Sequence, residues 1–265
     1  MNTAELLVKC LEKEGVKYIF GLPGEENLNI LEALKSSSIQ FITTRHEQGA
    51  AFMADVYGRL TGKAGVCLST LGPGATNLMT GVADANLDGA PLVAITGQVG
   101  TDRMHIESHQ YLDLVTMFSP VTKWNAQIVR PSNTSEIVRK AFKVAQQEKP
   151  GAVHIDLPEN IATMSVEGRP LNPDKREKSY SAYQSMTEAA VAISKAKNPI
   201  ILVGNGGLRG NASEAITEFA TQLNIPVANT FMGKGVIPYT HPLSLWTTGL
   251  QLSLIHISEP TRPLH

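Results

Sequence analysis

A single acidic residue, Glu47, lies where the sequence changes from a short β-rich run to a helical pattern. Residues 39–43 are mostly β-branched or aromatic, and small apolar residues recur on a helical period through residues 50–56. A carboxyl at such a junction has an ordinary structural explanation, because it stabilises a helix N-terminus by about 0.3–1 kcal/mol. The same group can act as a general acid or base where water is excluded. Which role applies depends on what the other loops bring beside Glu47.

Four polar or glycine-rich segments of the first half follow strand-like runs. They are residues 21–24, 45–47, 70–77 and 97–110. In open α/β sheets, ligands bind beyond the carboxyl ends of the strands. Because all four segments fall at such ends, the sequence predicts a binding site at one edge of a sheet.

The turn at residues 72–74, Gly-Pro-Gly, precedes a helical run and has a tempting alternative explanation. A glycine-rich turn before a helix often binds phosphate through its backbone N–H groups. No Lys-Ser or Lys-Thr pair follows this turn, so it is not a P-loop. A tight turn with a purely structural role also fits the residues.

The elements that must position these segments alternate along the chain. We expect helices at 3–14, 26–34, from 47, at 75–85 and 134–147, and strands at 17–20, 39–43, 65–70, 91–96, 121–124 and 152–157. The strands are short and continuously apolar, as in a sheet buried on both faces. This alternation predicts an α/β fold, a doubly wound and mostly parallel sheet with helices on both faces.

A polar, charged and proline-containing stretch at 167–178 predicts a linker to an incomplete second α/β domain. There we expect helices at 187–195 and 214–223 and strands at 199–203 and 226–228. The glycine-rich segment 204–210 is a weak dinucleotide signal. The predicted boundaries are a first domain at 1–165, a linker at 166–185, a truncated central Rossmann-like domain at 186–251 and, at 252–265, a non-native tail resembling a translated sequencing adapter.

Composition excludes several classes of function. The chain has 265 residues, 23 basic and 24 acidic, for a net charge of −1, which gives no support for a nucleic-acid partner. No apolar run is long enough to span a membrane, and no secretory signal precedes the first helix. Cys10 and Cys67 lie in apolar runs without metal-ligand spacing, so we expect buried thiols, no metal site and a cytoplasmic protein.

The motifs together resemble one family over residues 1–251. The segments that carry this likeness are 21–24, 45–54, 58–62, 72–78, 108–110 and 120–123. They are similar to thiamine-diphosphate-dependent decarboxylases and carboligases, and most closely to acetolactate synthase large subunits. The resemblance implies condensation of two pyruvates, with decarboxylation, to 2-acetolactate through a thiamine-diphosphate carbanion.

The resemblance also implies roles for individual residues. Glu47 hydrogen-bonds the cofactor's aminopyrimidine and activates the cofactor, and Gln110 reaches both cofactor and substrate. Of the remaining positions, Thr70, Pro73 and Asn77 shape the pyrimidine pocket, Pro23 and Gly24 contact the cofactor, and His109 contacts the substrate.

Further cofactors and partners follow from the same resemblance. The family's diphosphate and Mg²⁺ site lies in a third domain marked by Gly-Asp-Gly, which this sequence lacks. Its active site forms between two subunits, which implies a homodimer or tetramer and leaves open a regulatory small subunit. His109 is typical of flavin-free catabolic synthases, whereas residues 230–235 are nearer the flavin-containing pattern, so FAD and the choice between a catabolic role and branched-chain amino acid biosynthesis stay open.

One departure concerns the second substrate. Biosynthetic synthases usually carry Lys, near the second keto acid, where this chain has Glu159. Two alternatives therefore stand beside acetolactate synthesis. One is another thiamine-diphosphate 2-keto-acid decarboxylase, carboligase or oxidase, and the other is a non-catalytic fragment that only dimerises.

Overall fold

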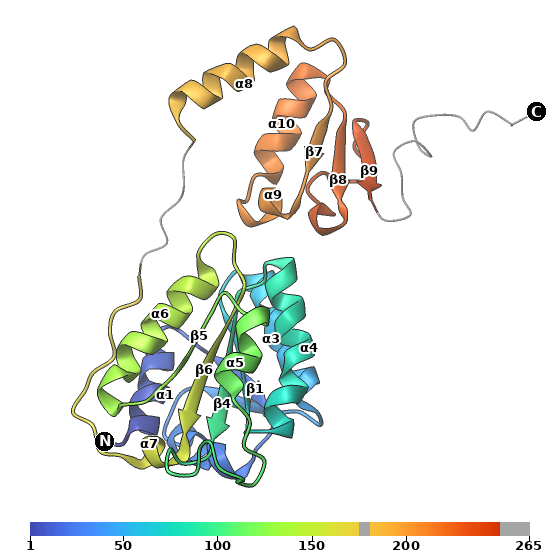
Figure 1. Ribbon diagram of the computed structural model, residues 1–265. Coiled ribbons are helices and arrows are strands. Elements are labelled where there is room, and N and C mark those ends of the chain that lie inside the picture. Colours follow the sequence, from blue (N-terminus) through green and yellow to red (C-terminus); the bar gives the residue numbers. More distant parts are fainter. Residues whose placement is uncertain (175–180, 250–265) are drawn as a thin grey trace, which may run out of the picture. The chain divides into compact units, whose positions relative to one another are not determined.

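The computed structural model describes residues 1–174 and 181–249. The chain divides into two compact units, residues 1–177 and 178–265, which are described separately (Figure 1). The expected tail at 252–265 and part of the expected linker lie outside the described residues.

The first unit is built on a six-stranded parallel sheet with the strand order β2-β1-β3-β4-β6-β5. The strands are β1 (Tyr18–Gly21), β2 (Gln40–Thr43), β3 (Gly65–Ser69), β4 (Leu92–Gln98), β5 (Trp124–Gln127) and β6 (Ala152–Pro158). Strands β3, β4 and β6 are buried along their whole length. The α/β fold expected from their continuous apolar character is thereby confirmed.

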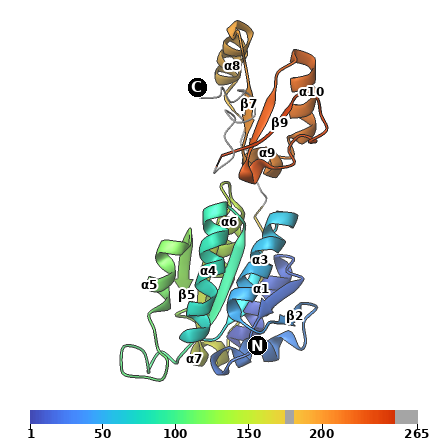
Figure 2. The ribbon, with the colours of Figure 1, turned by 90° about the vertical axis from the view of Figure 1, so that its right-hand side faces the viewer.

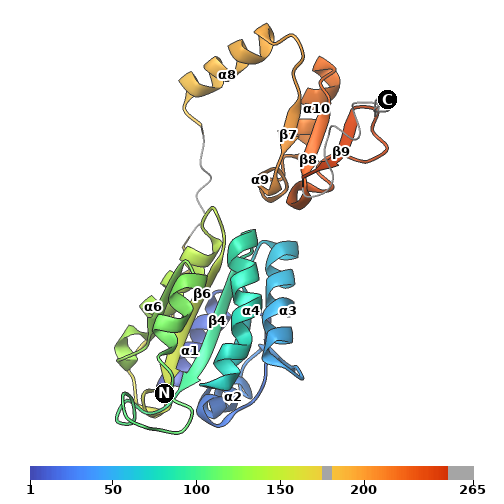
Figure 3. The same cartoon turned by 45° about the vertical axis from the view of Figure 1, so that its right-hand side comes forward.

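Helices cover both faces of this sheet. One face carries α1 (Thr3–Lys13), α2 (Leu28–Leu34), α6 (Thr134–Gln146) and α7 (Glu159–Thr163), and the other carries α3 (Glu47–Thr61), α4 (Pro73–Asp88) and α5 (Leu114–Phe118). Figures 2 and 3 show α3 and α4 side by side on the same face. Because side chains alternate along a strand, each face has its own apolar core.

Local signals set the ends of these helices. Asn2 caps α1 in a capping box with Glu5. Pro73 occupies the first turn of α4, where a missing N–H costs nothing. Gly62 ends α3 and Gly89 ends α4, both with left-handed backbone that glycine adopts without strain.

The expected strand at 121–124 is wrong. The structure has a 3-10 turn, η2 (Ser119–Val121), and the strand begins only at Trp124. Pro120 lies in the first turn of η2. The strand itself contains two polar residues, Asn125 and Gln127, so it lacks the continuous apolar pattern from which the other strands were predicted. The five-residue helices α5 and α7 were also not expected. The expected helix at 26–34 begins as a 3-10 turn, η1 (Glu25–Asn27), and a third such turn is η3 (Pro131–Asn133).

The second unit contains a parallel sheet with the order β7-β8-β9. Its elements are α8 (Tyr183–Lys195), β7 (Ile201–Val203), α9 (Asn205–Arg209), α10 (Ser213–Leu223), β8 (Val227–Thr230), η4 (Phe231–Gly233) and β9 (Ser244–Thr248). Strand β9 was not expected, and the glycine-rich segment 204–210 forms the short helix α9. No residue of α8 is buried, whereas α10 buries Ala220.

Candidate active site

Glu47 is the first residue of α3 and only 6% exposed. Glu47 does not cap the helix, because the N-cap is His46, whose Nδ1 accepts a hydrogen bond from the Gln48 N–H at 3.1 Å. Asn77 of the neighbouring helix α4 donates its Nδ2 to Glu47 Oε2 at 3.0 Å. Within the part of the chain that the structure describes, Glu47 Oε1 has no hydrogen-bond partner. One oxygen of this buried carboxyl is therefore held and the other is available to a ligand.

Glycines allow the loops beside Glu47 to pack closely. A Cβ at Gly74 would lie 3.3 Å from Glu47 Oε1 and 2.8 Å from Thr70 Cγ2. A Cβ at Gly24 would lie 2.4 Å from the Cβ of Thr70, closer than two side chains can approach. The 21–24 and 70–74 loops thus meet at Thr70, directly beside the carboxyl.

Thr70 is held by a second buried carboxyl, Glu26, which was not among the expected site residues. Thr70 Oγ1 donates to Glu26 Oε2 at 2.6 Å, and Glu26 is 9% exposed. The backbone of Glu26 packs on the end of β4, where a Cβ at Gly97 would lie 2.6 Å from the backbone carbonyl oxygen of Glu26. The sequence offered only one sign that Glu26 belongs to the site, which is that it follows the 21–24 loop at the carboxyl end of β1.

Gln110 is brought to this edge by the long loop 99–113, which runs from β4 to α5 (Figure 2). A Cβ at Gly72 would lie 2.6 Å from the Gln110 carbonyl oxygen, so this loop rests on the Gly72 turn. Both residues have a positive φ, +53° at Gly72 and +56° at Gln110. Such a conformation strains a non-glycine residue, and strained residues cluster at functional sites.

The other expected site residues differ in how close they lie to Glu47 and Thr70. Pro23 and Pro73 lie exposed on the turns that meet at Thr70. His109 is exposed and makes no hydrogen bond or ion pair with any described residue. The structure therefore joins Glu47, Asn77 and Thr70 with the glycines between them, and it brings Gln110 onto the adjoining turn.

A second polar cluster, which was not expected, lies buried between β4, β5 and β6. Thr96 Oγ1 donates to Asp156 Oδ1 at 2.7 Å and lies 2.8 Å from His154 Nε2, while Gln127 Nε2 donates to Asp156 Oδ2 at 2.7 Å. His154 stacks on Phe118, with ring centroids 4.0 Å apart. The signal was a polar pair two residues apart in an otherwise apolar strand, which places both side chains on one face.

Burial favours the uncharged form of both titratable groups in this cluster, so it shifts their pKa values in opposite directions. It raises the pKa of Asp156 to about 6, against hydrogen bonds from Gln127 and Thr96 that lower it. It lowers the pKa of His154 to about 3. With Asp156 ionised, the Thr96 hydroxyl donates to it and His154 carries its proton on Nε2, which leaves Nδ1 as the buried atom without a partner.

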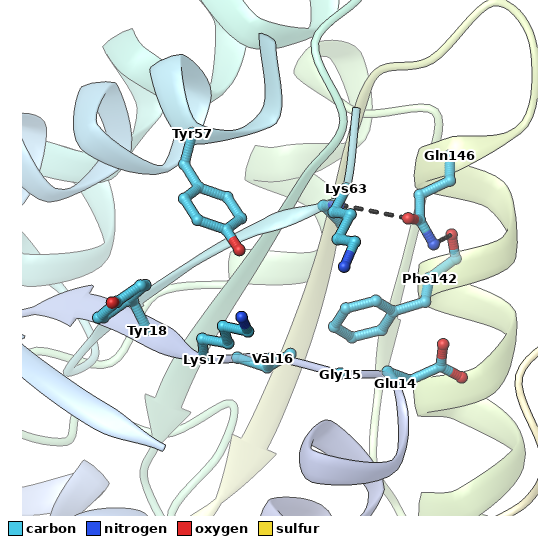
Figure 4. A pocket seen from close by; sticks show the side chains of 10 residues that line it. Glu14, Gly15, Val16, Lys17, Tyr18, Tyr57, Lys63, Phe142 and Gln146 are labelled. Atoms are coloured by element: carbon cyan, nitrogen blue, oxygen red, sulfur yellow. Dashed lines mark hydrogen bonds between the residues drawn. The ribbon is translucent and has the colours of Figure 1, made fainter. Parts of the chain in front are cut away.

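The small hollow in Figure 4 is separate from the candidate site. It lies at the amino ends of the strands, beside Glu14, Tyr18, Tyr57 and Lys63. Its volume is about 10 Å³, which is room for about one water molecule. Burial, followed by the charge of Asp174, raises the pKa of Glu14 to about 7. A hollow of this size at the opposite edge has no part in binding a keto acid.

Across residues 1–174 and 181–249, no group of three or more acidic, histidine or cysteine side chains is arranged to hold a metal ion. Over the same residues, every helix is too short or too polar to cross a membrane. Cys10 and Cys67 are free and buried, and burial raises the pKa of both thiols.

Two family models match the chain, one in each unit. Residues 1–117 match the model described as "Thiamine pyrophosphate enzyme, N-terminal TPP binding domain". Residues 186–254 match the model described as "Thiamine pyrophosphate enzyme, central domain". The chain belongs to the thiamine pyrophosphate enzymes.

Within this family the chain is similar to acetolactate synthases. It is 42% identical over 257 residues to a Methanocaldococcus jannaschii protein named "Probable acetolactate synthase large subunit", covering 94% of this chain and 44% of that protein. It is 39% identical to an Arthrospira platensis acetolactate synthase, covering 92% and 44% of the two chains. It is 37% identical to the large subunit of Escherichia coli (strain K12) acetolactate synthase isozyme 1, covering 93% and 44%. The chain thus spans less than half the length of these relatives.

Proposed function

We propose that the full-length protein carrying this chain is an acetolactate synthase that condenses two pyruvates, with loss of carbon dioxide, to 2-acetolactate. The observation that carries the proposal is the carboxyl of Glu47, buried at the carboxyl edge of the sheet with Oε1 left open. The names of the similar proteins support the same reaction.

The residues at this edge fit the aminopyrimidine of thiamine diphosphate. Glu47 Oε1 can hydrogen-bond a ring nitrogen while Asn77 holds Oε2 in place. Gly74 leaves room for the ring beside Oε1, since an added Cβ would lie only 3.3 Å from that oxygen. Thr70 and Pro73 would border the ring, with Pro23 and Gly24 on the adjoining turn. We propose residues 1–165 as the pyrimidine-binding domain and 186–251 as part of the central domain.

When bound, thiamine diphosphate supplies the carbon nucleophile and electron sink for decarboxylation of a 2-keto acid. The contribution of this chain is to bind, orient and exclude water. Glu47 holds or releases a proton at Oε1, while Asn77 keeps its other oxygen in place. Gln110, carried by the 99–113 loop, would reach the cofactor and substrate side, and His109 would contact the substrate.

Other parts of the proposal concern groups outside the described residues. Mg²⁺ and the diphosphate would be held by a further domain, facing Glu47 across a homodimer or tetramer interface, with a regulatory small subunit as a further partner. The absorbance spectrum of the purified protein answers whether FAD is bound. Because Cys10 and Cys67 are free thiols, we propose the reducing cytoplasm as its compartment.

The test is to incubate the full-length protein with pyruvate, thiamine diphosphate and Mg²⁺ and to identify the products. Acetolactate together with carbon dioxide supports the proposal. Acetaldehyde without acetolactate, or oxygen consumption, would assign another reaction of the same family. No conversion of pyruvate or of other 2-keto acids would favour the non-catalytic alternative.

A further inference from the structure

The loop 99–113 is tied at its start to the first two residues of α7. The Gly100 N–H donates to Glu159 Oε1 at 3.3 Å, and Glu159 also forms an ion pair with Arg103. Asn160 binds Thr101 twice. Its Oδ1 accepts from the Thr101 N–H at 3.1 Å, and its Nδ2 donates to Thr101 Oγ1 at 2.8 Å. Two side chains thus hold both the backbone and side chains of the loop's first turn.

The far end of the same loop is also held. Gln98 Nε2 donates to the carbonyl of Leu112 at 3.0 Å. Gln110 lies against Gly72, where an added Cβ would be 2.6 Å from the Gln110 carbonyl oxygen. Because the start and the end of the loop are both tied down, the intervening residues have a restricted set of positions.

The contacts differ in strength. The side chains of Arg103 and Glu159 are 43% and 31% exposed, so solvent screens their ion pair, and exposed pairs are worth little on average. Of the two hydrogen bonds between Asn160 and Thr101, one fixes the Thr101 backbone N–H and the other its hydroxyl, and neither depends on net charge. Both residues thus hold a backbone N–H of the loop, and Asn160 adds a second, uncharged hydrogen bond to Thr101.

We propose that Asn160 and Glu159 are positioning residues that hold the 99–113 loop so that Gln110 stays on the Gly72 turn. The inference rests on the proposed function, because that function places Gln110 on the cofactor and substrate side. Glu159 then acts through the loop, because its Oε1 accepts a hydrogen bond from the Gly100 N–H and its charge is neutralised by Arg103. Glu159 thereby has a structural use of its own at a position where biosynthetic synthases usually carry a lysine near the second substrate.

Three variants test the proposal. Asn160→Leu removes both hydrogen bonds to Thr101. Asn160→Asp keeps the acceptor for the Thr101 N–H, and the Thr101 hydroxyl can turn to donate to the new carboxylate. Glu32→Gln is the control, because it removes an exposed ion pair between Glu32 and Lys35 at the end of α2, outside this loop.

The first readout is backbone amide hydrogen exchange, measured by mass spectrometry on the 265-residue chain. In Asn160→Leu, peptides spanning 99–113 should exchange about fivefold or more faster, since a net hydrogen bond corresponds to roughly a two- to tenfold change in equilibrium. Asn160→Asp should restore most of the protection, and Glu32→Gln should leave it unchanged. Unchanged exchange over 99–113 in Asn160→Leu overturns the inference.

The second readout is steady-state kinetics of the full-length protein, with Gln110→Ala as reference. A positioning role predicts that Asn160→Leu lowers kcat about as Gln110→Ala does, with a smaller change in KM and with rescue by Asn160→Asp. If exchange rises but turnover falls in neither Asn160→Leu nor Gln110→Ala, the loop is held as described and the role proposed for Gln110 is wrong. If only Gln110→Ala loses turnover, Asn160 is not a positioning residue.

Discussion

Two carboxyl groups buried in the same sheet unit differ in what surrounds them. Asp156 is fully buried, and both of its oxygens accept hydrogen bonds, from Thr96 and from Gln127. Glu47 is nearly as buried, at 6% exposed, yet only Oε2 is engaged, by Asn77. Asp156 lies inside the sheet between neighbouring strands, whereas Glu47 lies beyond the strand ends.

The comparison shows that burial alone does not mark a functional carboxyl. Buried polar atoms are normally hydrogen-bonded, so a saturated carboxyl such as Asp156 is explained by the fold itself. Glu47 keeps an oxygen for a partner that the described residues do not supply. Its position at the carboxyl edge, where ligands of parallel sheets bind, points the same way.

The largest expected effect comes from Glu47→Gln. This change keeps the size of the side chain and its contact with Asn77 but removes the ability to take up a proton, so turnover of the full-length protein should fall at least a hundredfold. Pyruvate consumption and acetolactate formation are measured, with circular dichroism to check folding. Turnover close to that of the unmodified protein would place Glu47 with Asp156 as a structural carboxyl.

The second prediction concerns Asp156→Asn and the pH dependence of stability. With its pKa raised to about 6, Asp156 favours the folded state as pH falls from 6 to 4, because there the folded chain takes up a proton that the unfolded chain does not. With its pKa lowered to about 3, His154 disfavours the folded state over the same window, because only the unfolded chain is protonated below about 6.5.

In the unmodified chain these two contributions offset each other between pH 6 and 4. In Asp156→Asn only that of His154 remains, so the free energy of unfolding should fall, relative to the unmodified chain, by about 1.4 kcal/mol per pH unit. Over the two units the loss is roughly 2–3 kcal/mol. Urea unfolding at several pH values measures it. Parallel pH curves for the two proteins would show that this carboxyl does not titrate as its burial requires.

Asn77→Leu is expected to have a smaller effect on catalysis. It removes the donor to Glu47 Oε2 and leaves the carboxyl free to rotate. Hydrogen bonds to charged groups are worth about 1.5–3 kcal/mol, so kcat/KM of the full-length protein should fall about tenfold or more. An unchanged kcat/KM would mean that Glu47 is positioned without Asn77.

The smallest effects come from a matched pair of glycines. At Gly49, in α3, an added Cβ meets nothing within 4 Å, so Gly49→Ala should stabilise the chain by about 0.5–1 kcal/mol. At Gly74, in α4, the same Cβ would lie 2.8 Å from Thr70, and overpacking of about 1–3 kcal/mol should cancel or exceed that gain. Urea unfolding of both variants gives the difference. Equal stabilisation would show that the space beside Glu47 is not tight.

The sequence was sufficient to predict the parallel sheet and the sheet edge at which Glu47 lies. Strand-like apolar runs alternate with helical periods, so the parallel sheet and the edge that carries Glu47 followed directly. The strand at 121–124 was misplaced because Pro120 lies in a 3-10 turn that ends at Val121, and polar residues follow in the true strand.

Contacts between distant loops could not be predicted. Thr70 and Glu26 are 44 positions apart, and Arg103 and Glu159 are 56 positions apart. Each pair forms only because neighbouring strands end together, and no local pattern encodes which loop side chains then meet. The cluster at Asp156 left a weak local trace, two polar residues on one face of an apolar strand.

The role of Glu47 is tested best by a crystal structure of the full-length protein with thiamine diphosphate and Mg²⁺ bound. We expect a nitrogen of the aminopyrimidine ring to be hydrogen-bonded to Glu47 Oε1, while Asn77 stays on Oε2 and the Asp156 cluster is unchanged. If neither ring nitrogen were bound to Glu47, or if Glu47 Oε1 were satisfied by protein atoms alone, the proposed role of Glu47 would be wrong.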